Sequence, residues 1–192
     1  MQTINKRIFI AIDIAGSVSL KAMIRNFRRT LAGDSIKWVE DDNFHLTLYF
    51  LGETNIKIIN NLITDISREI GNISKFSISL QGVGIFGNIN NPKVLWIGIK
   101  DKSGNLKTIQ QKLSKMLVNY GFPEDQQKFS PHLTLGRIRN IKDISPLKNL
   151  IEQYRDVPFQ ELKVSKIVLH ESKLTHSGPI YSTIKEFPLS QE

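Results

Sequence analysis

The tetrapeptide His-Leu-Thr-Leu occurs twice in this chain, as His45-Leu46-Thr47-Leu48 and as His132-Leu133-Thr134-Leu135. The two copies lie 87 residues apart, and they contain two of the chain's four histidines. Each copy stands in a short run of apolar residues and threonine that is typical of a strand. A repeat of this length in similar settings indicates two related lobes.

Strand geometry gives each copy two chemically different faces. Successive side chains of a strand point to opposite faces, so residues two apart share a face. His45 therefore shares a face with Thr47, and His132 with Thr134. The leucines between them point the other way, which predicts an apolar anchor behind each His–Thr pair.

Two His–Thr pairs suit acid–base chemistry at phosphorus. A neutral imidazole accepts a proton near neutral pH and an imidazolium donates one, so two histidines on opposite sides of a phosphate can serve as base and acid. Two threonine hydroxyls can donate hydrogen bonds to the non-bridging oxygens. This chemistry requires no metal and no cofactor.

Other interpretations of the repeat remain. Strand histidines are often structural, although a core has little use for His and Thr on one face. A zinc site would need more ligands than two histidines, and neither copy contains Cys, Asp or Glu. His170 is expected to be structural and His176 to be exposed in a loop, since neither lies in a repeated context.

The flanking sequence predicts an α+β protein with mainly antiparallel sheets. Strands are expected over residues 7–13, 44–51, 75–86 (irregular at Gly82 and Gly84), 93–100, 131–138, 161–171 and 180–187, with loops at 88–92 and 172–179. Apolar residues at helical spacing predict helices over 17–32, 55–71, 104–120 and 145–154. Ser17 is the expected N-cap of the first helix and Gly33 its expected stop.

Composition limits the class of protein. The 192 residues are 40% hydrophobic and 23% charged, which suits a globular chain with a substantial core. The absence of cysteine excludes disulfides, thiolate catalysis and Cys-based zinc sites. The first residues show no signal-peptide pattern, and no apolar run is long enough to span a bilayer, so we expect a cytoplasmic protein.

The net charge of +8 is shared by both halves of the chain and favours anionic partners such as RNA. Four cations gather on one face of the first predicted helix: Lys21, Arg25, Arg28 and Arg29. Such a face is ordinarily solvated; contact with an RNA backbone near the active cleft is the alternative.

Taken with their flanks, the repeats resemble the RNA 2′,3′-cyclic phosphodiesterases of the 2H phosphoesterase superfamily, also called the 2′-5′ RNA ligase family. The likeness runs over nearly the whole chain. Its parts are residues 7–12, 38–53, 82–86, 94–96, 129–137 and 171–181.

The resemblance implies one bilobal domain over residues 1–192, with pseudo-twofold symmetry and both motifs lining a central cleft. It implies hydrolysis of a terminal 2′,3′-cyclic phosphate of RNA, or of a cyclic nucleotide, to a 2′-phosphate. His45 is then the proton donor, His132 the proton acceptor, and Thr47 and Thr134 the substrate-binding residues. We expect a monomer without cofactor.

Three positions qualify the resemblance. Tyr49 stands where many relatives have Arg, so one phosphate or base contact is in question. His176 stands where Pro is more usual. Arg137 is a candidate phosphate ligand, yet a regular strand would point it away from His132 and Thr134. A bulge at Gly136 would turn it back.

Two other functions use the same cleft. A 2′-5′ RNA ligase, or a phosphodiesterase of 2′,5′-linked nucleotides, would use the same transition state with a ribose hydroxyl in the place of water. A nucleotide-binding module would hold the ligand without turnover, but it would have no need of an acid and a base.

Overall fold

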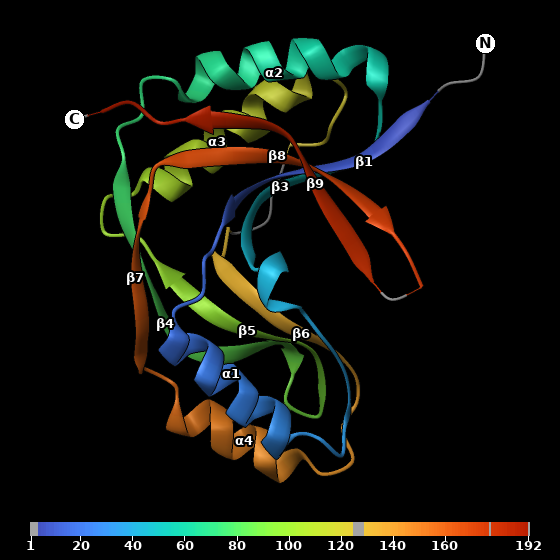
Figure 1. The fold of residues 1–192 in the computed structure, drawn as a ribbon, viewed down its shortest axis with the longest axis vertical. Helices are drawn as coiled ribbons and strands as arrows, with labels where there is room; N and C mark the ends of the chain where they lie inside the picture. The colour runs from blue at the N-terminus through green and yellow to red at the C-terminus, as the bar shows by residue number, and fades with distance from the viewer. Residues whose placement is uncertain (1–3, 125–128, 177, 192) are drawn as a thin grey trace.

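The computed structural model describes residues 4–124, 129–176 and 178–191, and its helices and strands are drawn in Figure 1. The first half contains β1 (Asn5–Asp13), α1 (Val18–Thr30), β2 (Ser35–Trp38), the 3-10 turn η1 (Asp41–Asn43), β3 (His45–Asn55), α2 (Ile56–Ile70) and β4 (Phe76–Asn88). The second half contains β5 (Asn91–Lys100), α3 (Asn105–Val118), β6 (His132–Asn140), α4 (Ile144–Gln153), β7 (Pro158–Val164), β8 (Lys166–Leu174) and β9 (Pro179–Pro188).

The strands form two antiparallel sheets, each covered by helices. One sheet has the order β3-β1-β8-β9, and the other has the order β2-β6-β5-β4-β7. Helices α2 and α3 pack on the first sheet, and α1 and α4 lie against the second, at the top and bottom of Figure 1. We call these halves the β1 lobe and the β5 lobe.

The two lobes are related by a pseudo-twofold exchange of strands. The order β3-β1-β8-β9 corresponds to β6-β5-β4-β7. In this correspondence β6 takes the position of β3, β5 that of β1, β4 that of β8 and β7 that of β9. The helix starts repeat the spacing of the histidines, since α1 begins at Val18 and α3 begins 87 residues later at Asn105. The predicted α+β, bilobal arrangement is therefore confirmed.

Local sequence explains where the helices begin. The Ser17 hydroxyl accepts a hydrogen bond from the Leu20 amide at 3.2 Å, as predicted for the N-cap of α1. The side chains of Asn55 and Asp143 cap α2 and α4 in the same way. All four predicted helices are present among the described residues, with ends shifted by one or two positions.

The prediction of one strand over residues 161–171 was wrong. The run divides at Ser165 into β7, which pairs with β4 in the β5 lobe, and β8, which pairs with β1 in the β1 lobe. No glycine or proline marks the division, because the chain stays extended while it crosses from one sheet to the other. The pairing partner, which the local sequence does not contain, decides where one strand ends.

Other predicted boundaries also differ. The predicted loop 88–92 is shorter, because β4 continues to Asn88 and β5 starts at Asn91. The short edge strand β2 was not predicted; it has four half-buried or exposed residues and little hydrophobic pattern. The predicted loop 172–179 is shorter, because β8 continues to Leu174 and β9 starts at Pro179; Ser177 lies outside the described residues. The predicted irregularity is confirmed at Gly82, as a register shift between Gln81 and Val83, but it was wrong for Gly84, which pairs with Trp96 in regular register.

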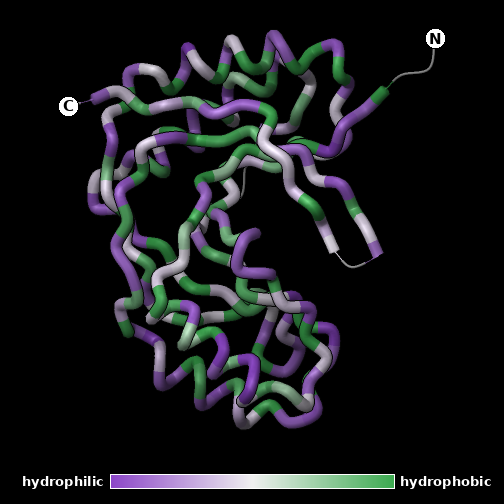
Figure 2. The backbone as a smooth tube through the Cα atoms, in the orientation of Figure 1, coloured by the Kyte–Doolittle hydropathy of each residue, from purple (hydrophilic) through white to green (hydrophobic). Residues whose placement is uncertain are grey.

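Buried apolar side chains of both sheets form one cluster. It includes Ile10 and Leu46 of the β1 lobe and Leu95 and Leu133 of the β5 lobe. Along the helices in Figure 2, hydrophobic and hydrophilic residues alternate within each turn, as expected for helices with one buried face. No helix in the described part of the chain is long and apolar enough to cross a membrane.

Candidate functional site

The repeated motifs meet where the two lobes join. His45 is the first residue of β3 and His132 the first of β6, and these two strands contact each other across the lobes. The two imidazoles are close enough for the charge of His132 to lower the pKa of His45. The structure thus brings together two histidines that lie far apart in the sequence.

The predicted alternation holds in both motifs. Leu46, Leu48, Leu133 and Leu135 are buried in the core. His45, Thr47, His132 and Thr134 are half-buried on the opposite face of their strands. Each pair of leucines therefore anchors a His–Thr pair on the less buried face of its strand.

Both imidazoles are held by the same kind of hydrogen bond. Nδ1 of His45 lies 2.7 Å from the carbonyl oxygen of Asn43, and Nδ1 of His132 lies 2.7 Å from that of Ser130. A carbonyl only accepts, so Nδ1 carries a proton in both rings. Nε2 is then the nitrogen left to exchange a proton with a substrate.

Aromatic rings orient the two imidazoles. The ring centroid of His45 lies 5.0 Å from that of Phe9 and 5.3 Å from that of Tyr181, which meets it edge-on. The ring of Phe86 meets His132 edge-on at 4.7 Å, and Trp96 lies behind Phe86 at 5.5 Å. Such contacts restrict ring rotation and exclude water from one side of each imidazole.

Burial is the main influence on both histidines. It lowers the pKa of His45, while the hydrogen bond to Asn43 acts in the opposite direction. Among the charges, His170 lowers the pKa of His45 further and Asp13 raises it. Burial also lowers the pKa of His132, and the nearby Arg137 guanidinium lowers it again.

A bulge turns Arg137 toward His132. In the pairing of β5 with β6, Leu95 lies opposite Gly136 and Trp96 opposite Thr134, so Leu135 is the extra residue. The bulge reverses the alternation, and Arg137 is exposed near enough for its charge to act on His132 and Tyr181. The reorientation that Gly136 was expected to permit is confirmed.

The corresponding bulge in β3 explains the position of Tyr49. Register shifts between β1 and β3 leave both Leu48 and Tyr49 buried. The Tyr49 hydroxyl donates a hydrogen bond to the Pro123 carbonyl oxygen, so this side chain belongs to the packing of its lobe. The counterpart of Arg137 is Phe50, 87 residues earlier, which is exposed.

Arg7 is a site residue that the sequence reasoning missed. Its guanidinium lies over the Phe50 ring at 4.9 Å from the centroid, and its charge lowers the pKa of Tyr181 against the larger effect of burial. Residues 7–13 carry no motif beyond a buried-strand pattern. Phe9 and Asp13 of the same strand were missed for the same reason.

The other two histidines differ from each other. His170 is buried on β8, and its Nε2 lies 2.8 Å from Oδ1 of Asp13. Asp13 is directly opposite His45 in the β1–β3 ladder. A structural role for His170 stays a prediction, but the residue lies beside the site. His176 is exposed, as predicted.

The basic face of α1 contacts its own chain. Arg28 donates a hydrogen bond to the Val39 carbonyl oxygen at 2.6 Å and lies 3.8 Å from Asp41. Lys21 lies 4.0 Å from the same carboxylate, and Arg29 donates to the Asn26 side chain.

In the described part of the chain, no group of three or more His, Cys, Asp or Glu side chains is arranged to hold a metal ion.

Known proteins are similar to this chain in sequence and in fold. The sequence profile of the 2′-5′ RNA ligase superfamily matches residues 17–175. A protein of Methanocaldococcus jannaschii named RNA 2′,3′-cyclic phosphodiesterase is 37% identical over 182 residues, which cover 94% of this chain and 99% of that protein. One of Aquifex aeolicus with the same name is 39% identical over 158 residues, covering 80% and 81%.

Solved structures share the fold. TT0787 of Thermus thermophilus matches with a TM-score of 0.74 at 23% identity, covering 97% of this chain and 99% of that one. Escherichia coli LigT in complex with 3′-AMP matches with a TM-score of 0.75 at 22% identity, covering 98% and 100%. From the profile match and the curated relatives, this chain belongs to the 2′-5′ RNA ligase superfamily.

Proposed function

We propose that this chain is an enzyme that hydrolyses the 2′,3′-cyclic phosphate at the end of RNA to a 2′-phosphate. The observation that carries the proposal is the pair of half-buried histidines, each with Nδ1 on a backbone carbonyl and Nε2 left for the substrate. The names of its relatives in Methanocaldococcus jannaschii and Aquifex aeolicus support the same activity.

The proposed reaction is an in-line displacement at phosphorus. His132 accepts a proton from water as the water oxygen forms a bond to phosphorus. The bond from phosphorus to the 3′ oxygen breaks, and His45 donates a proton to that oxygen. The product carries a 2′-phosphate and a 3′-hydroxyl, and each well-placed proton-transfer group contributes about 10²–10⁴ in rate.

One neighbouring charge at each histidine supports this division of roles. Asp13 lies opposite His45 and raises its pKa, which favours the protonated acid, although the larger effect of His170 lowers it. Arg137 lowers the pKa of His132, which favours the neutral base. Asp13 and Arg137 thus act in opposite directions on the pKa values of the two histidines.

The remaining site residues would hold the phosphate. The hydroxyls of Thr47 and Thr134 share a strand face with the histidines, and they would donate hydrogen bonds to the non-bridging oxygens. The Arg137 guanidinium would add charge complementarity. This chemistry needs neither metal nor cofactor, since both protons move through imidazoles.

The proposal extends to the state of the protein. We place the whole of residues 1–192 in one bilobal unit, because the buried cluster contains residues of both sheets. The unit is proposed to act as a monomer in the cytoplasm. Size-exclusion chromatography with light scattering tests the monomer, and fractionation of the native cells tests the location.

The decisive experiment follows an RNA oligonucleotide that ends in a 2′,3′-cyclic phosphate. We expect conversion to a 2′-phosphate at an unchanged rate in EDTA, and a loss of about 10²-fold or more in His45→Ala and in His132→Ala. His176→Ala, which changes an exposed histidine, is the matched control.

Three results would contradict parts of the proposal. Full activity in the double variant His45→Ala/His132→Ala would eliminate the two-histidine mechanism, and loss of activity in EDTA would eliminate metal independence. Tight binding without any product would indicate a nucleotide-binding module. Formation of 2′-5′ linkages from the same ends would favour the ligase function.

A further inference from the structure

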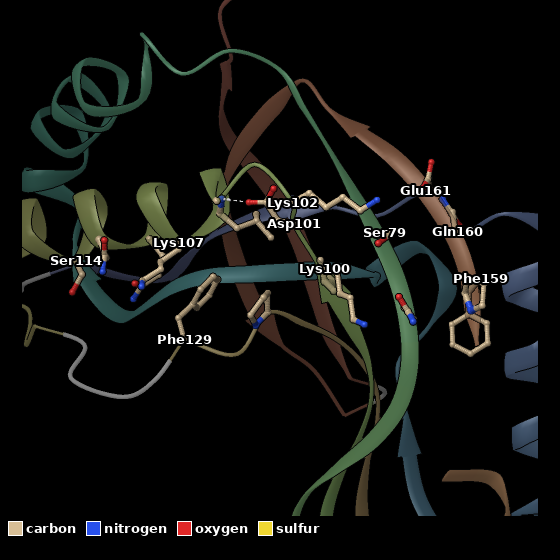
Figure 3. Close-up of a pocket in the computed structure, with 18 of the residues that line it drawn as sticks. Ser79, Lys100, Asp101, Lys102, Lys107, Ser114, Phe129, Phe159, Gln160 and Glu161 are labelled. Carbon is tan, nitrogen blue, oxygen red and sulfur yellow. Dashed lines mark hydrogen bonds between the residues drawn. The ribbon is translucent and has the colours of Figure 1, made fainter. Parts of the chain in front are cut away.

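A large open cavity adjoins the second motif without including the His or Thr residues of either motif. Its volume is about 1230 Å³, which exceeds what one nucleotide requires. It lies between α3, the end of β5, β4 and β7, and Figure 3 shows side chains of these elements around one hollow. We call it the lysine cavity, for its four lysines: Lys100, Lys102, Lys107 and Lys115.

The cavity continues from His132 along the same face of its sheet. Gly98 lies opposite His132 in the ladder, and Lys100 is two residues farther along β5 on that face. The Ile99 amide donates a hydrogen bond to the Pro131 carbonyl oxygen at 3.0 Å, which holds the segment before His132 against β5. Phe129 and Pro131 of that segment line the cavity.

The lysines of the cavity are available to bind an anion. All four are exposed, and within the described ranges none of their ammonium groups makes an ion pair or a hydrogen bond. Of the three carboxylates in the lining, Asp101 already accepts hydrogen bonds from the Leu106 amide at 2.7 Å and the Ser103 amide at 2.8 Å. Glu124 and Glu161 are the other two, so the cations are in excess.

The pseudo-twofold symmetry shows that this charge is particular to one side of the site. β1 ends at Asp13, and the counterpart strand β5 ends at Lys100, 87 residues later. Strand alternation places Asp13 on the same face of β1 as Phe9, and Lys100 on the same face of β5 as Trp96. These are the faces that bear the motifs. A polyanion leaving the site would therefore meet an anion on one side and a cation on the other.

We propose that the lysine cavity binds the RNA strand that lies 5′ of the terminal nucleotide. This inference rests on the proposed function, in which the cyclic phosphate occupies the space between His45 and His132. Because that phosphate is at the 3′ end, the rest of the RNA leaves the site in one direction only. The lysines bind the backbone phosphates, and the partly exposed ring of Phe129 offers a surface against which a base can stack.

The experiment compares a nucleoside 2′,3′-cyclic phosphate with a hexaribonucleotide that has the same end. In the variant Lys100→Gln/Lys107→Gln, we expect kcat/KM for the hexamer to fall about tenfold and kcat/KM for the mononucleotide to stay unchanged. The slope of log kcat/KM against log salt should become shallower for the hexamer, by about 0.7 for each phosphate that the variant no longer neutralises.

A binding measurement separates this inference from the proposed activity. Fluorescence anisotropy of a labelled hexaribonucleotide with a 3′-phosphate gives the Kd without turnover, and we expect it to rise about tenfold in the same variant. The matched control is Lys57→Gln/Lys148→Gln, which removes two exposed lysines that do not line the cavity.

Each outcome decides the question. Equal weakening of the Kd in the cavity variant and the control would overturn the lysine cavity as an RNA site, and so would an unchanged Kd in both. Absence of hydrolysis of either substrate, with selectively weakened hexamer binding in the cavity variant, would overturn the proposed function and retain the RNA site.

Discussion

A hydrogen bond joins His170 to Asp13 beside His45, the proposed acid, with Nε2 and Oδ1 2.8 Å apart. The imidazole is buried on β8, while the carboxylate is about half exposed at the end of β1. The hydrogen bond from His170 is the largest of the influences that lower the pKa of Asp13, so this carboxylate stays ionised. A fixed negative charge therefore lies opposite His45.

Removing this charge should move the pH optimum. In Asp13→Asn the support for protonated His45 is removed and its pKa falls, so the maximum of kcat/KM moves to lower pH. Asp156→Asn, an exposed aspartate away from the motifs, is the control, and an identical shift there would contradict this reasoning.

The wild-type profile should itself be bell-shaped and acidic. Both histidines have pKa values lowered from 6.5, chiefly by burial. Activity needs neutral His132 and protonated His45, so it rises as pH passes the first pKa and falls as pH passes the second. The maximum of kcat/KM, which reports the free enzyme, is expected below pH 6.5. A maximum above about pH 8 would be inconsistent with these environments.

Arg137 should move the pH optimum in the other direction. Because its guanidinium lowers the pKa of His132, the variant Arg137→Gln should move the maximum of kcat/KM to higher pH and raise KM for the anionic substrate. Arg139→Gln removes an exposed cation two residues farther along β6 and serves for comparison. If the two variants behave alike, the effect is one of net charge and not of the bulge that turns Arg137.

The leaving group should distinguish the two histidines. With a p-nitrophenyl phosphodiester, the departing oxygen needs little protonation. His45→Ala should then lose much less activity than it does on RNA, whereas His132→Ala should stay impaired, because water still needs a base. Equal losses of activity in both variants with this substrate would contradict the assignment of His45 as the acid and His132 as the base.

The threonines should act on the bound phosphate. Thr47→Val and Thr134→Val each remove one donor to a charged oxygen, worth roughly 1.5–3 kcal/mol, and we expect kcat/KM to fall about 10- to 100-fold. Thermal unfolding should change little, because both side chains are only half-buried. Thr64→Val on the exposed surface of α2 is the control, and wild-type kinetics in all three variants would exclude the threonines as phosphate ligands.

Gly84 should be intolerant of a side chain. A Cβ there would lie 2.3 Å from the Trp96 ring, which packs on Phe86 and through it on His132. We expect Gly84→Ala to cost about 1–3 kcal/mol in chemical unfolding and to lower kcat. Gly33→Ala, where a Cβ would meet open space, should be neutral. Equal free energies of unfolding in the two variants would show that the Trp96 ring can move aside without loss of stability.

The local sequence was sufficient for much of the site. Strand alternation alone placed His45 with Thr47, and His132 with Thr134, on faces opposite their buried leucines. The 87-residue repeat of the tetrapeptide predicted two related lobes, and the starts of α1 and α3 show the same spacing. The strand faces and the helix starts depend on side-chain period and capping, which act between neighbouring residues.

Tertiary structure decided the rest, because it depends on pairing partners that local sequence does not encode. Residues 161–171 divide between two sheets because residues up to Val164 pair with β4 and residues from Val168 pair with β1. Arg137 faces His132 only because Leu135 is extra in the β5–β6 ladder, and Asp13 approaches His170 across 157 residues of sequence. The sequence by itself determined two histidines and their strand faces; only the folding of the lobes onto one another placed a carboxylate beside one and a guanidinium beside the other.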